Sequence, residues 1–353
     1  MRTFIILSIV IFSAVTSSFS LVAKEGVEGK FLGAKTAIHP DWFKESFLDL
    51  EEDVEDASKA GKRLVVYFWQ PACPYCSQLW SDNFAEKDIL DSFRKNFEIV
   101  AINIWGDKEV VMIGGKTYTE KSFADALSIA YTPSLLFFNE NKKVIHKVAG
   151  YIPPADFRLI LEYVSRHKEK EGNFASFLEA KHQSKKMGNK ALLHKEDFFL
   201  KPPYDLNIAN FSKEDKEKYS VVFFEKPNCK NCDLLHEKTL KDADTRDLIK
   251  QFRAIQLNRY ANTKVITPTG KETTAKDWAT ELNISYLPAM IFFDAKGKEV
   301  MRIDTQMRSF HIQSVYDYVL SGEYKKETNF QRYISKRSEK IRKQGKDVDI
   351  WKY

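Results

Sequence analysis

The sequence lacks a hydrophobic run long enough to cross a membrane. Its most apolar stretch, residues 4–15, follows Arg2 and leads into Ser18-Phe19-Ser20, whereas a membrane-spanning helix needs about 20 apolar residues. A charged start, a short apolar run and a small-x-small site are typical of a secretory signal peptide. We assign residues 1–20 to a cleaved signal peptide. An uncleaved anchor is the alternative, and Leu21-Val22-Ala23 is a second candidate cleavage site.

Two further absences narrow the expected location. No cysteine lies near the cleavage site, which excludes a lipoprotein anchor, and the final residues, Trp351-Lys352-Tyr353, are not an endoplasmic-reticulum retention signal. No second long apolar run follows. We therefore expect an exported protein of a bacterial periplasm with no stable membrane span.

The body of the chain lacks an excess of either charge. The formal net charge is +6, and residues 325–353 alone hold ten Lys or Arg against four Asp or Glu. The surplus therefore lies in a basic tail, residues 326–353, which we expect to be a helix with a solvated charged face. Nucleic acid is not an expected partner of an exported protein. Attraction to anionic lipid or to an acidic partner is the alternative interpretation.

Cysteine is scarce, and none is left unpaired by the pattern. The only four are Cys73, Cys76, Cys229 and Cys232, which form two C-x-x-C pairs. A bridge across two residues constrains little chain, so redox cycling suits these pairs better than structural stapling. A four-thiolate zinc site is the competing interpretation, but zinc ribbons space their pairs by about 15–20 residues, and here 152 residues intervene. We expect no metal and no cofactor.

The two halves of the chain repeat one pattern. Residues 62–73 and residues 219–229 each contain a run of apolar, β-branched and aromatic residues that ends in x-Pro-x-Cys. A helical stretch follows each run. A second strand, a polar excursion with glycine, a helix and a strand that opens with proline follow in both halves. The distance from the first cysteine to that proline is 60 residues up to Pro133 and 59 up to Pro288. This order predicts an α/β fold of two tandem domains, each with a central mixed sheet flanked by helices.

These signals place domain boundaries along the chain. We assign the first domain to residues 36–166 and the second to residues 216–325. The Lys-, Glu- and Asn-rich residues 167–215 are interpreted as a flexible connector, interrupted at Lys201-Pro202-Pro203. An apolar stripe of Phe330, Ile334 and Ile341, with Tyr333, predicts that the tail helix docks on the second domain.

These residues resemble the thioredoxin superfamily over nearly all of the expected mature chain. Cys-Pro-Tyr-Cys is the arrangement seen in glutaredoxins, and its wider context, residues 70–76, 103–107 and 131–133, is similar to periplasmic SoxW-type thioredoxins. The resemblance implies that Pro133 and Pro288 are cis and expose the preceding backbone beside the disulfide. It also implies disulfide-bearing client proteins and a membrane thiol-electron transporter as the electron donor.

The sequence departs from thioredoxin at two places in each half. The resemblance leads one to expect a buried acid six residues before the first cysteine, where Tyr67 and Phe223 stand. It also leads one to expect tryptophan directly before that cysteine, where Ala72 and Asn228 stand. A thioredoxin-like reduction potential therefore does not follow from the resemblance.

The chemistry of a C-x-x-C pair assigns different roles to its two cysteines. Thiolate is the nucleophile, and a helix N-terminus lowers the pKa of a thiol placed there and exposes it. We expect Cys73 and Cys229 to be the attacking cysteines and Cys76 and Cys232 to be the shielded, resolving ones. Lys230 adds a cation to the second pair, which predicts that the second site is the more oxidising.

Three other conspicuous residues are given structural interpretations. We expect His236, four residues after Cys232, to be an exposed helical histidine; a position near the second site is the alternative. Trp69 and Trp105 are interpreted as core or rim aromatics.

The sequence thus predicts an exported thiol–disulfide oxidoreductase that reduces or isomerises client disulfides. A disulfide-forming oxidant is the second hypothesis. A client-binding module without turnover is the third, although such a module has no chemical need for two intact pairs.

Overall fold

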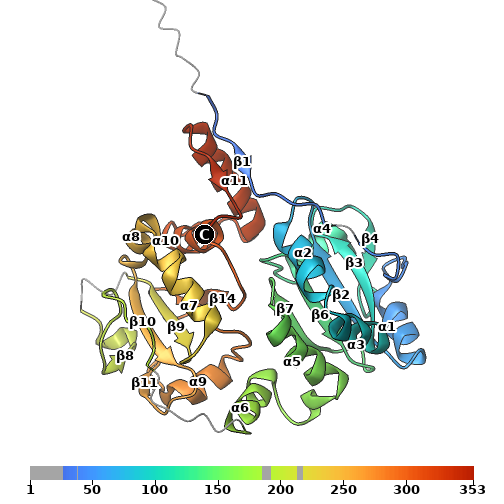
Figure 1. Ribbon diagram of the computed structural model, residues 1–353, viewed down its shortest axis with the longest axis horizontal. Helices are drawn as coiled ribbons and strands as arrows, with labels where there is room; N and C mark the ends of the chain where they lie inside the picture. Colours follow the sequence, from blue (N-terminus) through green and yellow to red (C-terminus); the bar gives the residue numbers. More distant parts are fainter. Residues whose placement is uncertain (1–26, 38, 185–191, 213–217) are drawn as a thin grey trace, which may run out of the picture.

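The computed structural model describes residues 27–37, 39–184, 192–212 and 218–353. The predicted signal peptide, residues 1–20, lies outside this part of the chain. Figure 1 shows two α/β units side by side, with β1 (Phe31–Leu32) and α11 (Phe330–Lys343) projecting above them. No helix in the described ranges is long and apolar enough to cross a membrane.

The first unit is built on a four-stranded sheet in the order β3-β2-β6-β7. These strands are β2 (Arg63–Trp69), β3 (Phe97–Asn103), β6 (Ser134–Phe138) and β7 (Val144–Ala149). Strand β3 is parallel to β2, whereas β6 is antiparallel to both β2 and β7. The central strand β2 is buried on both faces, as its uninterrupted apolar run predicts.

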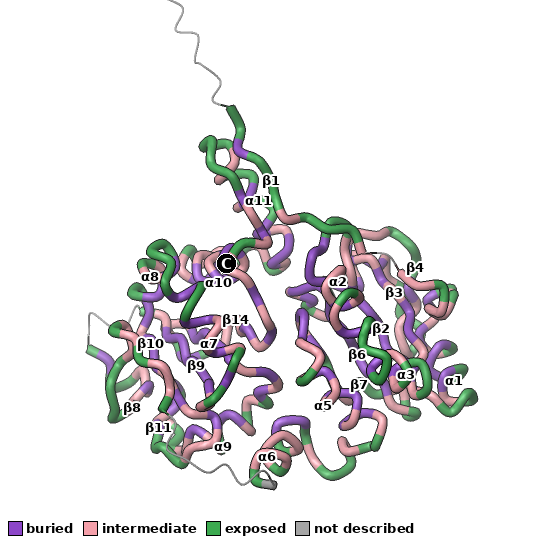
Figure 2. The backbone as a smooth tube through the Cα atoms, viewed as in Figure 1, coloured by how far each residue is buried: buried purple, intermediate pink, exposed green. Residues whose placement is uncertain are grey.

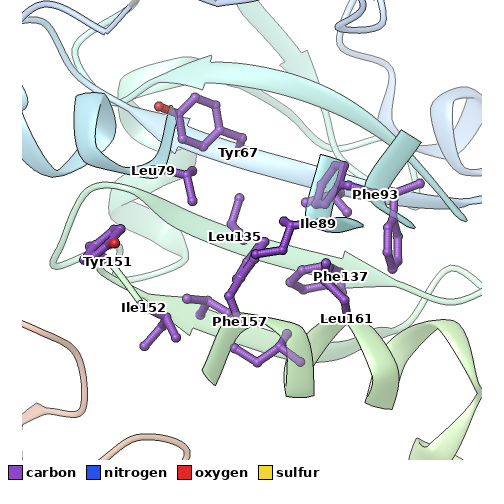
Figure 3. Packing of buried hydrophobic residues seen from close by; sticks show 14 of the residues in the cluster. Tyr67, Leu79, Ile89, Phe93, Leu135, Phe137, Tyr151, Ile152, Phe157 and Leu161 are labelled. Atoms are coloured by element: carbon purple, nitrogen blue, oxygen red, sulfur yellow. The ribbon is translucent and has the colours of Figure 1, made fainter. Parts of the chain in front are cut away.

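Helices cover both faces of this sheet. On one face lie α1 (Leu50–Lys59) and α4 (Glu120–Ala126); on the other lie α2 (Pro74–Gln78), which continues as a π-helical turn at Leu79–Asn83, α3 (Lys87–Asn96) and α5 (Pro154–Ser165). Figure 3 shows side chains of β6 meeting those of α5, for example Leu135 beside Phe157. A hairpin of β4 (Glu109–Val111) and β5 (Thr117–Thr119) occupies the predicted polar excursion.

The second unit repeats this plan with the order β10-β9-β13-β14. Its sheet consists of β9 (Ser220–Glu225), β10 (Arg253–Asn258), β13 (Ala289–Phe293) and β14 (Glu299–Ile303). Its helices are α7 (Lys230–Glu237), α8 (Ala243–Ile249), α9 (Ala275–Glu281) and α10 (Ser309–Leu320), and its hairpin is β11 (Lys264–Ile266) with β12 (Glu272–Thr274). The predicted tandem α/β architecture is confirmed. Figure 2 shows the central strands of the sheets, β2 and β9, largely buried.

The segment between the units is more ordered than a flexible connector. Helix α6 (Phe174–Ser184) buries Phe174 against the core of the first unit. The same helix reaches the second unit, where Ala175 N–H donates to Asn283 Oδ1 at 3.1 Å and Arg259 Nη2 donates to Ala175 O at 3.0 Å. Strand β8 (Tyr204–Asp205) then pairs with β11. The segment therefore contributes to both folds, although residues 185–191 and 213–217 lie outside the described chain.

The basic tail forms α11 (Phe330–Lys343) and β15 (Val348–Asp349). Phe330, Tyr333 and Ile334 are buried in the core of the second unit, so the predicted docking of this helix is confirmed. Strand β15 pairs in parallel with β1 (Phe31–Leu32). The first and last described elements of the chain are therefore joined (Figure 1).

Candidate active sites

The first cysteine pair lies where β2 leads into α2. Cys73 is the N-cap of α2, and its Sγ accepts a hydrogen bond from the Cys76 N–H at 3.0 Å. Pro74 occupies the first turn, where the N–H that proline lacks would have had no partner within the helix. Cys73 and Cys76 form a disulfide. The free N–H groups of this helix end favour a negative charge on Cys73 once the bond is reduced.

The second pair has the same local geometry. Cys229 is the N-cap of α7, and its Sγ accepts from the Cys232 N–H at 3.1 Å. Cys229 and Cys232 also form a disulfide. Within the described residues, no group of three or more His, Cys, Asp or Glu side chains is arranged to hold a metal ion.

The two predicted prolines open β6 and β13. Both the Thr132–Pro133 and the Leu287–Pro288 peptide bonds are cis, as the resemblance implies. Cys73 Sγ lies 3.6 Å from Thr132 O and 3.4 Å from Thr132 Oγ1. The residue before the first cis proline is thus in contact with the first disulfide.

Both attacking cysteines are buried, contrary to the prediction that they are exposed. Cys73 is 2% exposed and Cys229 is 4% exposed, close to the values of the two resolving cysteines. The prediction considered one unit at a time, in which a helix N-terminus at the edge of a sheet faces solvent. It is wrong for the first site because the second unit covers that site.

The active-site dipeptide of each unit contacts the last sheet-covering helix of the other unit. Tyr75 Oη accepts from the Arg308 N–H at 2.8 Å, and the Tyr75 ring lies 5.1 Å from that of His311. In the other direction, Asn231 Nδ2 donates to Asp156 Oδ2 at 3.5 Å. His311 and Asp156 are both the third residue of their helices, α10 and α5. The two units therefore face each other with approximate twofold symmetry.

The loops that precede these helices meet in the same symmetric way. Thr305 Oγ1 donates to Tyr151 O at 2.6 Å, and the Gln306 N–H donates to the same oxygen at 3.1 Å. A Cβ placed on Gly150 would lie 2.5 Å from Thr305 Oγ1, so only glycine permits this approach. Each unit also buries one tyrosine, Tyr131 or Tyr286, in the core cluster of the other. The hydrophobic cores of the two units therefore meet at their interface.

A buried charged pair lies behind the second disulfide. Glu225, the last residue of β9, is 0% exposed, and its carboxylate lies 3.0 Å from Nε2 of His236, which is 3% exposed. Nδ1 of His236 lies 2.9 Å from Glu196 Oε1. The predicted exposure of His236 is therefore wrong, because the acid that binds it comes from the strand beneath the helix. One helical turn separates His236 from Cys232, which places both on the same face of α7.

These partners change the protonation of His236. Burial alone lowers its pKa, but the hydrogen bonds and negative charges of Glu225 and Glu196 outweigh burial and raise the pKa above its ordinary value. The pair is in turn held by neighbours, since Gln256 Nε2 donates to Glu225 and Arg246 forms an ion pair with Glu196. The ring of His194 stacks on His236 at 4.5 Å and contacts Asp233.

Aromatic side chains occupy the corresponding place behind the first disulfide. Trp69 stands where Glu225 stands in the second unit, and Trp80 stands where His236 stands. The His39 ring lies 4.4 Å from that of Trp69, and burial lowers the pKa of His39. Trp69 packs against the core, and Trp105 lies in the wall of the cavity above Cys73 and donates from Nε1 to Gln70 Oε1 at 2.8 Å, so both fit the predicted core or rim position.

Comparisons with known proteins agree with this architecture. The thioredoxin-like domain family matches the chain twice, over residues 50–165 and 205–320. The chain belongs to the thioredoxin-like family. Its two thioredoxin-like units carry the cysteine pairs at the same place in each match. Comparison with curated proteins gives no significant match.

Several solved structures are similar to parts of this thioredoxin-like chain. A thioredoxin-fold protein from Helicobacter pylori is 22% identical, with 38% of this chain and 93% of that chain covered and a TM-score of 0.32. Spinach chloroplast thioredoxin f is 18% identical, with 40% and 98% covered and a TM-score of 0.23. The C-terminal domain of Neisseria meningitidis DsbD is 12% identical, with 33% and 92% covered and a TM-score of 0.25.

The sequence located the cysteines and prolines but not their surroundings. It gave no indication that Glu225 and His236 would meet, although a glutamate at the end of an otherwise apolar strand was a usable signal. The contacts of Tyr75 and Asn231 across the interface had no signal in either repeat taken alone.

Proposed function

We propose that this chain is an exported thiol–disulfide oxidoreductase that reduces or isomerises disulfides of periplasmic client proteins. The observation that carries the proposal is the duplicated site, a C-x-x-C pair at a helix N-terminus in each unit, followed by a cis proline. Such a cysteine is activated as a thiolate, and a second cysteine one turn further on can resolve the mixed disulfide.

The exchange reaction balances within each site. The thiolate of Cys73 or Cys229 attacks a client disulfide and releases one client thiolate. Cys76 or Cys232 then attacks the mixed disulfide and releases the second client thiolate. Two electrons pass to the client, and the enzyme pair becomes oxidised. Export rests on the signal-peptide pattern at residues 1–20, and a membrane thiol transporter as the electron donor rests on the resemblance to SoxW-type thioredoxins.

Reduction of insulin by dithiothreitol tests the activity. We expect the wild-type chain to accelerate it and the Cys73→Ser, Cys229→Ser double variant to lose the acceleration. Each single variant isolates the other site and reports its share. If the wild-type chain gives no acceleration while client binding survives in the double variant, the chain is a client-binding module.

The direction of electron flow needs a separate measurement. A disulfide-forming oxidant remains the second candidate, because Ala72, Asn228, Tyr67 and Phe223 depart from the reducing thioredoxin pattern. Reactivation of reduced, unfolded ribonuclease by the oxidised chain would favour the oxidant. Reactivation of scrambled ribonuclease by the reduced chain would favour the isomerase.

A further inference from the structure

A cavity of about 310 Å³ lies above the first disulfide, with Cys73 in its wall. The first unit supplies Trp105, Thr132 and the active-site loop. The second unit supplies the loop Thr305–Met307, and α11 supplies Gln331, Ile334 and Ser335. Its volume is at the lower end of the range for small-molecule sites. A folded protein surface does not fit between these walls.

The wall of this cavity carries no formal charge. None of the described residues that line it is Asp, Glu, Lys or Arg. His311 is its only histidine, and burial, with the nearby Arg308 charge, lowers the pKa of His311 to about 4, so the ring is neutral at pH 7. The Arg308 guanidinium itself stacks on Trp351 and Tyr353, at 4.0 and 4.2 Å from the ring centres. A carboxylate brought into the cavity would therefore lose water without gaining a cation.

Hydrogen-bonding groups are fixed around Cys73. Gln70 Nε2 donates to Thr132 Oγ1 and to Gln331 Oε1, both at 2.9 Å, and its Oε1 accepts from Trp105. Gln331 Nε2 donates to Ala130 O at 2.7 Å. This chain of amides holds α11 over the first site and presents neutral polar atoms beside apolar ones. Such a lining suits a small polar molecule without charge.

An ion pair outside the cavity holds the same helix in place. Arg332 Nη2 lies 2.8 Å from Asp125 Oδ2, and Asn329 Nδ2 donates to Asp125 Oδ1 at 2.5 Å. Asp125 belongs to α4 of the first unit, whereas Asn329 and Arg332 belong to the tail. Neither Arg332 nor Asp125 is among the residues that line the cavity above Cys73. Removal of this contact should therefore weaken the attachment of α11 to the first unit without changing the residues that line the cavity.

We propose that, while the units face each other, the first site exchanges with small uncharged disulfides and thiols and excludes anionic and folded ones. This rests on the proposed thiol–disulfide exchange and names its substrate class. The reduced Cys73 thiolate attacks R–S–S–R and R–S⁻ leaves. Cys76 then attacks the Cys73–S–S–R bond and releases the second R–S⁻. Two electrons reach the substrate, the protein disulfide re-forms, and the two thiol protons end on two R–SH.

The test uses the full chain with Cys229→Ser and Cys232→Ser, so that only the first site reacts. The prereduced protein is mixed with bis(2-hydroxyethyl) disulfide, which is neutral, or with oxidised glutathione, which is anionic and larger. Oxidation is followed by maleimide gel shift. Each rate is divided by the rate of dithiothreitol with the same disulfide, which corrects for intrinsic reactivity.

We expect the corrected rate for the neutral disulfide to exceed that for oxidised glutathione at least tenfold. Asp125→Ala should reduce this ratio to below threefold. Asp107→Ala, which removes an exposed ion pair with Lys121 in the same unit, is the matched control and should leave the ratio unchanged.

The outcomes separate the selectivity from the activity. Equal corrected rates for both disulfides would overturn the selectivity, and a ratio that Asp125→Ala does not change would overturn its origin in the position of α11; both outcomes leave the exchange activity intact. No reaction with either disulfide, in a protein that remains folded by circular dichroism, would overturn the proposed function itself.

Discussion

Behind the first disulfide, β2 ends in Trp69, and the His39 ring contacts both Trp69 and Trp80 of the helix. Behind the second, β9 ends in Glu225, and His236 covers it from the equivalent helical position. At the disulfide itself, both sites have the same components, an N-capping cysteine and a cis proline. Duplication has therefore preserved what the exchange reaction needs while the support beneath it has diverged from aromatic packing to a buried ionic network.

The difference matters because burial acts on the two supports in opposite ways. Aromatic side chains gain free energy when they leave water, whereas a buried carboxylate is tolerated only when it is paired and hydrogen-bonded. Glu225 meets that condition through His236 and Gln256. The support behind the second disulfide should therefore depend on protonation and on single polar groups more steeply than the support behind the first.

The largest expected effect comes from removing the buried acid. Glu225→Ala leaves His236 and Gln256 without their shared partner, and loss of one member of a buried pair costs about 3–5 kcal/mol. Urea unfolding, followed by a probe in the second unit, measures the loss. Glu237→Ala, on the exposed side of the same helix, is the control and should change the free energy of unfolding by less than about 0.5 kcal/mol. A similar small change for both variants would mean that the pair contributes no net stability.

A second effect distinguishes the units by pH. Burial lowers the pKa of His146, in the first unit, from 6.5 to about 4. Below about pH 6.5 this histidine binds a proton in the unfolded chain, whereas in the folded chain it stays neutral down to about pH 4. The first unit therefore loses stability as the pH falls from 6.5 to about 4, by about 3 kcal/mol at most. Comparison of wild type with His146→Phe, which cannot titrate, isolates this loss. An equal decline in both proteins would assign the acid sensitivity to other groups.

His236 should give the opposite trend. Its folded pKa is raised above 6.5, so its contribution is fully present below pH 6.5 and is lost as the pH rises through the folded value. Stability of the wild type relative to His236→Gln should therefore decrease as the pH rises above about 6.5. A difference that is flat over this range would show that the partners of His236 do not favour its charged form.

The smallest expected effect concerns the reduction potentials. Lys230 is exposed beside Cys229, and the equivalent residue of the first site is Pro74. An exposed cation beside a thiolate favours it by about 0.2–1 kcal/mol, or about 4–20 mV for a two-electron couple. Lys230→Ala should lower the potential of the second pair by that amount, measured in the full chain with the first pair changed to serine. Wild-type potentials that are equal, or higher at the first site, would contradict the prediction that the second site is the more oxidising.

Local pattern was sufficient to predict most of the fold. The second strand expected in each half corresponds to β3 and β10, and the strand expected to open with proline corresponds to β6 and β13, because alternation of apolar residues and the position of proline are local signals. Helices α1, α3 and α8 were not predicted. Their apolar residues are few, and only contact with the sheet reveals which side of each helix is buried, as with Ile89 and Phe93 of α3.

The environment of the sites could not be predicted, for a different reason. Several features of the sites depend on how the two domains dock. They are the burial of Cys73, the contact of Tyr75 with Arg308, and the packing of Tyr131 and Tyr286 each in the core of the other unit. Docking is decided by the shape and polarity of surfaces that are assembled from distant segments. No spacing within one repeat encodes it, so each repeat considered alone suggested an open site.

The pairing of β1 with β15 has a consequence for biosynthesis. The Lys30 N–H donates to Asp347 Oδ1 at 2.6 Å across 317 positions of sequence. Domains of a growing chain fold in order from the N-terminus, so the first unit can form its disulfide long before its cover exists. Phe31 and Ile350 both line the cavity above Cys73, so its wall is complete only after Ile350 has been synthesised. During synthesis the first site is therefore open to enzymes that oxidise or reduce it, and it becomes selective only when the last strand arrives.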